Sequence, residues 1–138
     1  MDMLESRVDG TIVIGSADSE IHRTLGDIIT SDFRKNVLSV TETSDLLLEI
    51  LDKRVDLTII DVNLKGLPTT KAIQILKKCR PRMPVVVISD DYTVATGSSI
   101  MELGVFYYMY KPIDLDSFKE IVDSALRKKA RDEAQERR

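Results

Sequence analysis

Short apolar runs alternate with longer amphipathic segments along the chain. Five runs rich in Val, Ile and Tyr stand at residues 11–15, 36–40, 56–61, 84–89 and 106–110. The first, third and fourth runs are apolar on both faces, which is typical of strands buried in a parallel sheet. The pattern therefore predicts five strands, and burial of at least those three on both sides.

The segments between the runs carry apolar side chains at helical spacing. The stripes are Ile21, Leu25, Ile28 and Ile29; Leu47, Leu48 and Leu51; Ile73 and Leu76; and, after the last run, Leu115, Phe118, Val122 and Ala125. Each stripe gives a helix one face that packs on a sheet. The segment 93–103 is weaker because Gly97 lowers helix stability by about 1 kcal/mol, so we expect this helix to be short or mobile. The alternation predicts an α/β fold, a (βα)5 doubly wound, five-stranded parallel sheet with right-handed crossovers.

Composition excludes several classes of function. The 138 residues, 43% hydrophobic and 31% charged, suit one soluble domain, and a formal net charge of −3 does not favour binding to nucleic acid or to anionic membranes. One cysteine, Cys79, and one histidine, His22, exclude a disulfide framework and a histidine metal cluster. We expect a cytoplasmic protein without membrane spans, in which Cys79 is structural and His22 lies on the surface.

The two ends of the chain differ from its middle. Residues 1–8 are a polar extension, and large apolar residues stop after Leu126. Residues 129–138 form a highly charged, helix-compatible tail, which is either a solvated extension of the last helix or a linker to a further domain. The predicted domain therefore covers residues 9–128.

Polar side chains stand where three of the predicted strands end. In doubly wound sheets the site lies beyond the carboxyl ends of the strands. Asp61, Ser89 and Lys111 end the third, fourth and fifth strands, so a carboxylate, a hydroxyl and an ammonium are expected to converge. Such a set suits an aspartate that accepts a phosphoryl group, whereas for Asp61 taken alone a cap of the next turn is the commoner explanation. A cis bond between Lys111 and Pro112 would aim the lysine inward.

These residues carry a resemblance to a known family. Through "VDLTIIDVNLKG", "MPVVVIS" and "ELGVFYYMYKPID", residues 9–128 resemble the response regulator receiver domain of two-component phosphorelay signalling. The resemblance implies the strand order 2-1-3-4-5, with Asp61 as phosphoacceptor and Lys111 as the residue that pairs with the phosphoryl group. It implies that Ser89 and Tyr108 are the switch residues.

The resemblance also implies how such a module signals. Its surface would be the fourth helix, fifth strand and fifth helix, with Tyr107, Tyr110, Lys119 and Glu120 as exposed candidates, although plain alternation in an edge strand explains the tyrosines equally well. The implied partners are a sensor histidine kinase or another signalling protein, with a downstream output domain and a second copy of the chain as further options. Direct nucleic-acid binding and membrane binding are not expected, and the module is not expected to be an enzyme.

The turn after the first strand departs from the family. Receivers usually carry two adjacent acids there that help to hold Mg²⁺, and alignment places Ser16 and Ala17 at these positions. Asp18 falls one residue later, where it is better suited to cap the first helix. With Asp61 as the one sure acidic ligand, we expect weak Mg²⁺ binding, impaired phosphorylation and no organic cofactor.

Two further acids follow Ser89, where the family usually has a small residue. Asp90 and Asp91 are solvated loop acids, or part of a rearranged metal site, or, for Asp90, a fixed negative charge near Lys111. The main alternative is therefore a phosphorylation-competent receiver in which Asp18 or Asp90 holds the metal. A remote alternative is a flavodoxin-like binder of a small ligand, for which the chain lacks a glycine-rich phosphate loop.

Overall fold

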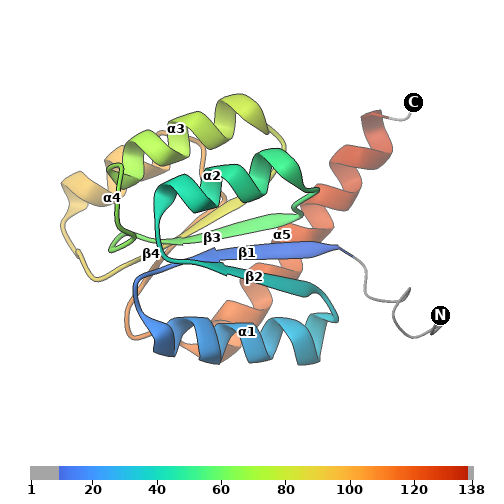
Figure 1. The fold of residues 1–138 in the computed structure, drawn as a ribbon, viewed down its shortest axis with the longest axis horizontal. Helices are drawn as coiled ribbons and strands as arrows, with labels where there is room; N and C mark the ends of the chain where they lie inside the picture. The colour runs from blue at the N-terminus through green and yellow to red at the C-terminus, as the bar shows by residue number, and fades with distance from the viewer. Residues whose placement is uncertain (1–9, 137–138) are drawn as a thin grey trace.

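The computed structural model describes residues 10–136, which form a five-stranded sheet between two layers of helices (Figure 1). The strands are β1 (Thr11–Gly15), β2 (Asn36–Val40), β3 (Leu57–Asp61), β4 (Val85–Ser89) and β5 (Tyr107–Tyr110). The helices are α1 (Ser19–Phe33), α2 (Thr43–Asp52), α3 (Thr69–Cys79), α4 (Val94–Met101) and α5 (Leu115–Glu136). The predicted five-fold alternation of strand and helix is confirmed. The extension predicted for residues 1–8 lies outside the described residues.

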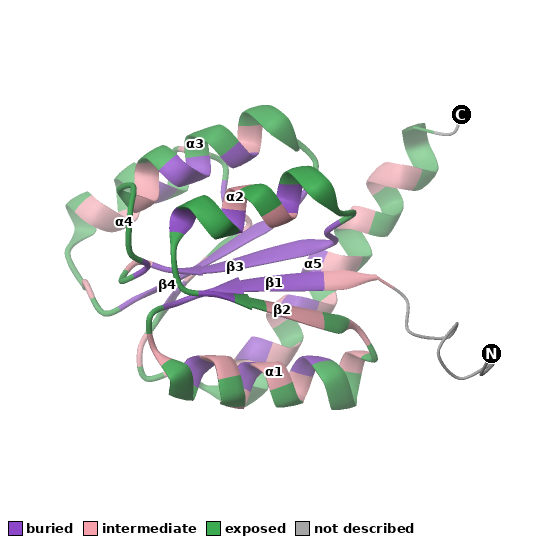
Figure 2. Cartoon of the chain, viewed as in Figure 1, coloured by how far each residue is buried: buried purple, intermediate pink, exposed green. Residues whose placement is uncertain are grey.

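The sheet is parallel throughout and has the order β2-β1-β3-β4-β5, as the family resemblance implied. All residues of β3 and β4 are buried, whereas the edge strands β2 and β5 are partly exposed (Figure 2). The strand order reverses between β1 and β3. The carboxyl ends of these two strands therefore open onto the crevice where doubly wound folds place their sites.

Side chains that alternate along the strands divide the core in two. Helices α2, α3 and α4 cover one face of the sheet through Leu46, Ile73 and Ile100 among others. Helices α1 and α5 cover the other face, with Leu25 and Phe118 in its centre. Because successive residues of a strand point to opposite faces, an apolar run without polar interruptions supplies both clusters at once.

Helix α4 is short, as predicted. It has eight residues, and Ile100 is its one buried residue. Gly97 faces β5, where a Cβ atom would lie 3.7 Å from Tyr108 and 3.8 Å from Tyr110. The helix therefore contributes little to the core, and its attachment to β5 depends on aromatic contacts.

Helix α5 continues into the charged tail as far as Glu136. Ion pairs join this part of the helix to the loops at the amino ends of the strands: Glu133 lies 2.5 Å from Arg54, Glu136 lies 2.6 Å from Arg82, and Lys129 lies 3.6 Å from Asp56. The described part of the tail thus continues α5 with most of its residues exposed, and ion pairs join it to the domain. No helix of residues 10–136 has the length and apolar character that crossing a membrane requires.

Candidate functional site

Asp61 lies at the carboxyl end of β3 and is fully buried. Its Oδ2 accepts a hydrogen bond of 2.8 Å from the Ser16 hydroxyl and lies 2.9 Å from the Lys111 ammonium. Its Oδ1 accepts a hydrogen bond of 3.2 Å from the backbone N–H of Asn63. A buried carboxylate is stable only when it is paired in this way, and here both of its oxygens already have partners.

Lys111 reaches Asp61 from the end of β5, as the positions of the strand ends predicted. Its peptide bond to Pro112 is cis, and its own backbone N–H donates to the Ser89 carbonyl at 2.9 Å. The Tyr92 hydroxyl donates to the carbonyl of Lys111. The lysine side chain is 21% exposed, whereas the carboxylate with which it pairs is fully buried.

The turn after β1 brings one of its two predicted positions to the site. Gly15 pairs in register with Ile60, so Ser16 lies beside Asp61. Ala17 is exposed, and it contributes only its backbone N–H, which donates to Asn63 Oδ1 at 3.2 Å. Ser16 therefore contacts Asp61 through its side chain, whereas Ala17 contacts Asn63 through its backbone.

The acids near Asp61 do not fit a magnesium ion. Asp18 is the N-cap of α1, as predicted, and its carboxylate accepts the backbone N–H of Glu20 at 2.9 Å. Asp90 is exposed, and no ion pair of the described residues joins it to Lys111. Residues 10–136 contain no group of three or more His, Cys, Asp or Glu side chains arranged to hold a metal. Mg²⁺ requires several oxygen ligands in near-octahedral geometry, and this site offers one carboxylate that is already paired.

Ser89 is fully buried but does not bond to Asp61. Its hydroxyl accepts the backbone N–H of Asp91 at 2.9 Å. The Asp91 carboxylate in turn accepts the Thr93 backbone N–H at 2.9 Å and the Thr96 hydroxyl at 2.8 Å. The Thr93 backbone N–H, followed by the hydroxyls of Thr93 and Thr96, lowers the pKa of Asp91. Asp91 is thus a loop acid whose carboxylate also organises the start of α4.

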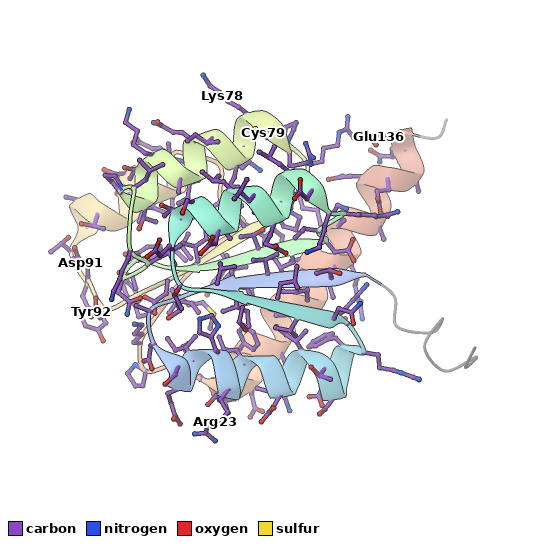
Figure 3. The ribbon with its side chains drawn as sticks, in the orientation of Figure 1. Arg23, Lys78, Cys79, Asp91, Tyr92 and Glu136 are labelled. Atoms are coloured by element: carbon purple, nitrogen blue, oxygen red, sulfur yellow. The ribbon has the colours of Figure 1, made fainter. Side chains whose placement is uncertain are left out.

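Tyrosines connect this loop to β5. The Tyr108 hydroxyl donates to the Asp91 carbonyl at 3.2 Å, and the Tyr108 ring meets Tyr110 edge-on at a centroid distance of 5.3 Å. The ring centroids of Tyr92 and Tyr110 are 5.0 Å apart. Figure 3 shows Asp91 and Tyr92 together beyond the end of the sheet next to α4. Lys119 is not part of this group of tyrosines; its side chain is 45% exposed and pairs with Asp32 of α1 at 3.0 Å.

His22 and Cys79 also differ from expectation. His22 is partly buried, and its Nε2 lies 2.8 Å from the Ser16 carbonyl oxygen, so it supports the turn after β1. Cys79 is exposed and is not part of the core (Figure 3). Sequence reasoning missed Asn63 and Tyr92 as site residues. Asn63 had a signal, since it follows the strand end at Asp61 by two residues, whereas nothing near Tyr92 in the sequence indicates its contact with Lys111.

Comparison with known proteins identifies the family of this chain. The model of the family described as response regulator receiver domain matches residues 12–123. The chain belongs to this family. Among its relatives, the transcriptional regulatory protein ZraR of Salmonella typhimurium is 23% identical over 90% of this receiver. The transcriptional regulator NtrC of Azospirillum brasilense is 29% identical over 84% of it.

Solved receiver structures share the fold. A CheY-like receiver domain protein of Methanospirillum hungatei superimposes with a TM-score of 0.81 at 18% identity, covering 89% of this receiver and 98% of that chain. NtrX of Brucella abortus gives a TM-score of 0.82 at 24% identity, covering 94% of this receiver and 30% of that chain. This receiver spans 27% of ZraR and 24% of NtrC, so it corresponds to one domain of these longer proteins.

Proposed function

We propose that this receiver is a signalling module of a two-component phosphorelay in which Asp61 holds the phosphoacceptor position but Mg²⁺-dependent phosphorylation is impaired. One observation carries the proposal. Both oxygens of the buried Asp61 carboxylate are engaged, by Ser16 and Lys111 on one side and by the Asn63 N–H on the other. Transfer of a phosphoryl group adds negative charge to the carboxylate, and cations at the site normally offset that charge. In this receiver Lys111 supplies one positive charge, and no neighbouring acid supports a metal ion that would supply more.

The same contacts oppose phosphorylation in a second way. An incoming phosphoryl donor needs a free carboxylate oxygen, and the hydroxyl of Ser16 occupies Oδ2 from the direction of β1. An aspartate in place of Ser16 would instead repel Asp61 and attract a cation between the two. Ser16 thus favours a closed site, in which the Asp61 carboxylate is hydrogen-bonded within the protein. A carboxylate at position 16 would favour a site that holds a metal ion.

Signalling then proceeds by protein contact through the surface of α4, β5 and α5. Exposed side chains on and next to this surface include Tyr92, Val94, Tyr107 and Tyr110. The partner is a sensor histidine kinase or another signalling protein, and the relatives that are transcriptional regulators make a downstream output domain the natural recipient. Residues 9–128 are the receiver unit in this proposal, and the charged residues 129–138 are its linker to an output domain. Pairing with a second copy through the same surface is a further option.

Incubation with acetyl phosphate and Mg²⁺, followed by intact-mass measurement, tests the proposal. We expect no gain of a phosphate in the unchanged protein and a gain in Ser16→Asp, which is lost again in the double variant with Asp61→Asn. A phosphate gained by the unchanged protein and abolished by Asp61→Asn would overturn the impairment. Loss of that phosphate in Asp18→Asn or Asp90→Asn would then show that these acids hold the metal.

A further inference from the structure

A cationic cavity lies at the end of the domain opposite Asp61. It has a volume of about 210 Å³ and is formed by the end of α3, the loops that precede β4 and β5, and the middle of α5. Three basic residues line it, namely Lys77, Arg82 and Lys128, together with residues 104–106. In Figure 3 the labels of Cys79, at the end of α3, and Glu136, at the end of α5, mark this end of the molecule.

The three cations have unequal partners. Arg82 lies 2.6 Å from Glu136, and Lys128 lies 2.7 Å from Asp132, so each has an acid on the last turns of α5. Lys77 forms no ion pair within residues 10–136. Its ammonium donates to two neutral acceptors, the carbonyls of Pro81 at 3.0 Å and Met83 at 3.5 Å.

The position of Lys77 is electrostatically unfavourable without a counter-ion. Burial, and after it the positive charge of Lys128, lower the pKa of Lys77. An anion in the cavity would offset both effects, because it would pair with the ammonium and would screen it from Lys128. The two carbonyl acceptors use only part of the donor capacity of an ammonium, which has three N–H groups.

From this arrangement we propose that the cavity binds a small phosphate-type oxyanion, held by Lys77, Arg82 and Lys128. The volume favours a single ionic group, because pockets for larger organic ligands measure about 300–1,000 Å³. Positive charges from three separate elements suit an anion that accepts several hydrogen bonds at once, although the side chains of Arg82 and Lys128 are 53% and 48% exposed. Glu136 and Asp132 compete with this anion, because they pair with Arg82 and Lys128 in its absence. The ligand is free phosphate or the phosphate group of a small phosphomonoester.

Titration followed by amide NMR tests the proposal on the whole chain. Sodium phosphate and O-phosphoserine are the two probes, added at constant ionic strength against sodium chloride, and the shifts are read at Gly104 and Val105. We expect saturable shifts with at least one probe, and the tighter probe identifies the source of the phosphate group. Shifts that remain linear, or that match those in sodium chloride, would overturn the proposal.

Charge variants assign the site to its residues. Lys77→Gln and Lys128→Gln should each weaken binding about tenfold, as expected for loss of a hydrogen bond between charged groups. Lys78→Gln is the matched control, because this substitution removes the same charge from α3 at a side chain that points away from the domain (Figure 3). It should change affinity less than about twofold, since exposed charges act weakly at a distance in salt. Equal weakening by Lys77→Gln and Lys78→Gln would overturn the assignment.

The competing acid provides a variant with the opposite sign. Glu136→Gln releases Arg82 from its ion pair, so phosphate should bind more tightly than to the unchanged protein. Weaker or unchanged binding would show that Arg82 does not hold the anion. Because all shifts are read far from Asp61, failure of this proposal leaves the proposed signalling function untouched, and phosphorylation at Asp61 leaves this proposal untouched.

Discussion

Replacement of Ser16 by alanine removes the side chain that holds the Asp61 carboxylate in place. The Ser16 hydroxyl donates to Asp61 at 2.8 Å and accepts the Asp18 backbone N–H at 2.9 Å. A hydrogen bond to a charged group contributes about 1.5–3 kcal/mol, and a neutral one contributes about 0.5–1.5 kcal/mol. Alanine also avoids the cost of burying a hydroxyl, which offsets part of the loss. We therefore expect Ser16→Ala to lower the free energy of unfolding by about 2 kcal/mol.

Urea denaturation measures this loss. For a domain of this size the dependence of unfolding free energy on urea is about 2 kcal/mol per molar, so the midpoint should fall by about 1 M. Ser39→Ala is the control, because Ser39 is exposed on the edge strand β2 and should change stability by less than about 0.5 kcal/mol. If the two variants have the same midpoint, the Ser16 hydroxyl does not hold Asp61, and the reasoning about the closed site fails with it.

Three more predictions concern α4, the loop before it and the loop before α3. Gly97→Ala should stabilise the domain by about 0.5–1 kcal/mol in urea denaturation, because the added Cβ would lie 3.7 Å from its nearest neighbour; a lower midpoint would contradict this. Gly66→Ala should destabilise it by at least about 1 kcal/mol by the same assay, since φ is +107° and the Cβ would lie 2.3 Å from the Thr43 hydroxyl; unchanged stability would refute the strain. Hydrogen bonds, above all from the backbone N–H of Thr93, lower the pKa of Asp91 from 3.8. The charged Asp91 carboxylate therefore stabilises the folded protein at neutral pH, and this stabilisation is lost as pH falls through the lowered pKa. In parallel thermal scans Asp91→Asn should therefore be less stable than the unchanged protein at pH 7, with a gap that closes below about pH 4; a gap independent of pH would count against it.

The sequence by itself determined the fold class and the place of the site. Uninterrupted apolar runs at β3 and β4 can be buried only between two helical layers, and stripes such as Leu25 and Ile29 on α1 provide those layers. The position of Asp61 and Lys111 at strand ends follows from the same pattern, because parallel strands bring their carboxyl ends to one edge. These inferences depend on periodicity, which is a local property of the chain.

Tertiary structure alone decided which atoms meet at that edge. The Ser16 hydroxyl donates to Asp61, whereas the backbone N–H of Ala17 donates to Asn63. Which of these two neighbouring residues meets Asp61 depends on the register between β1 and β3. Likewise, the Ser89 hydroxyl bonds to the backbone N–H of Asp91 and not to Asp61.

The cationic cavity shows the same limit at the other end of the domain. Its cations Lys77, Arg82 and Lys128 come from α3, the loop before β4 and α5, and no spacing in the sequence relates the first two to the third. The physical reason is that side-chain partners are chosen by distances across the folded chain, after the strands and helices have packed. Hydrophobic periodicity fixes which face of each element is buried, but it carries no information about those distances.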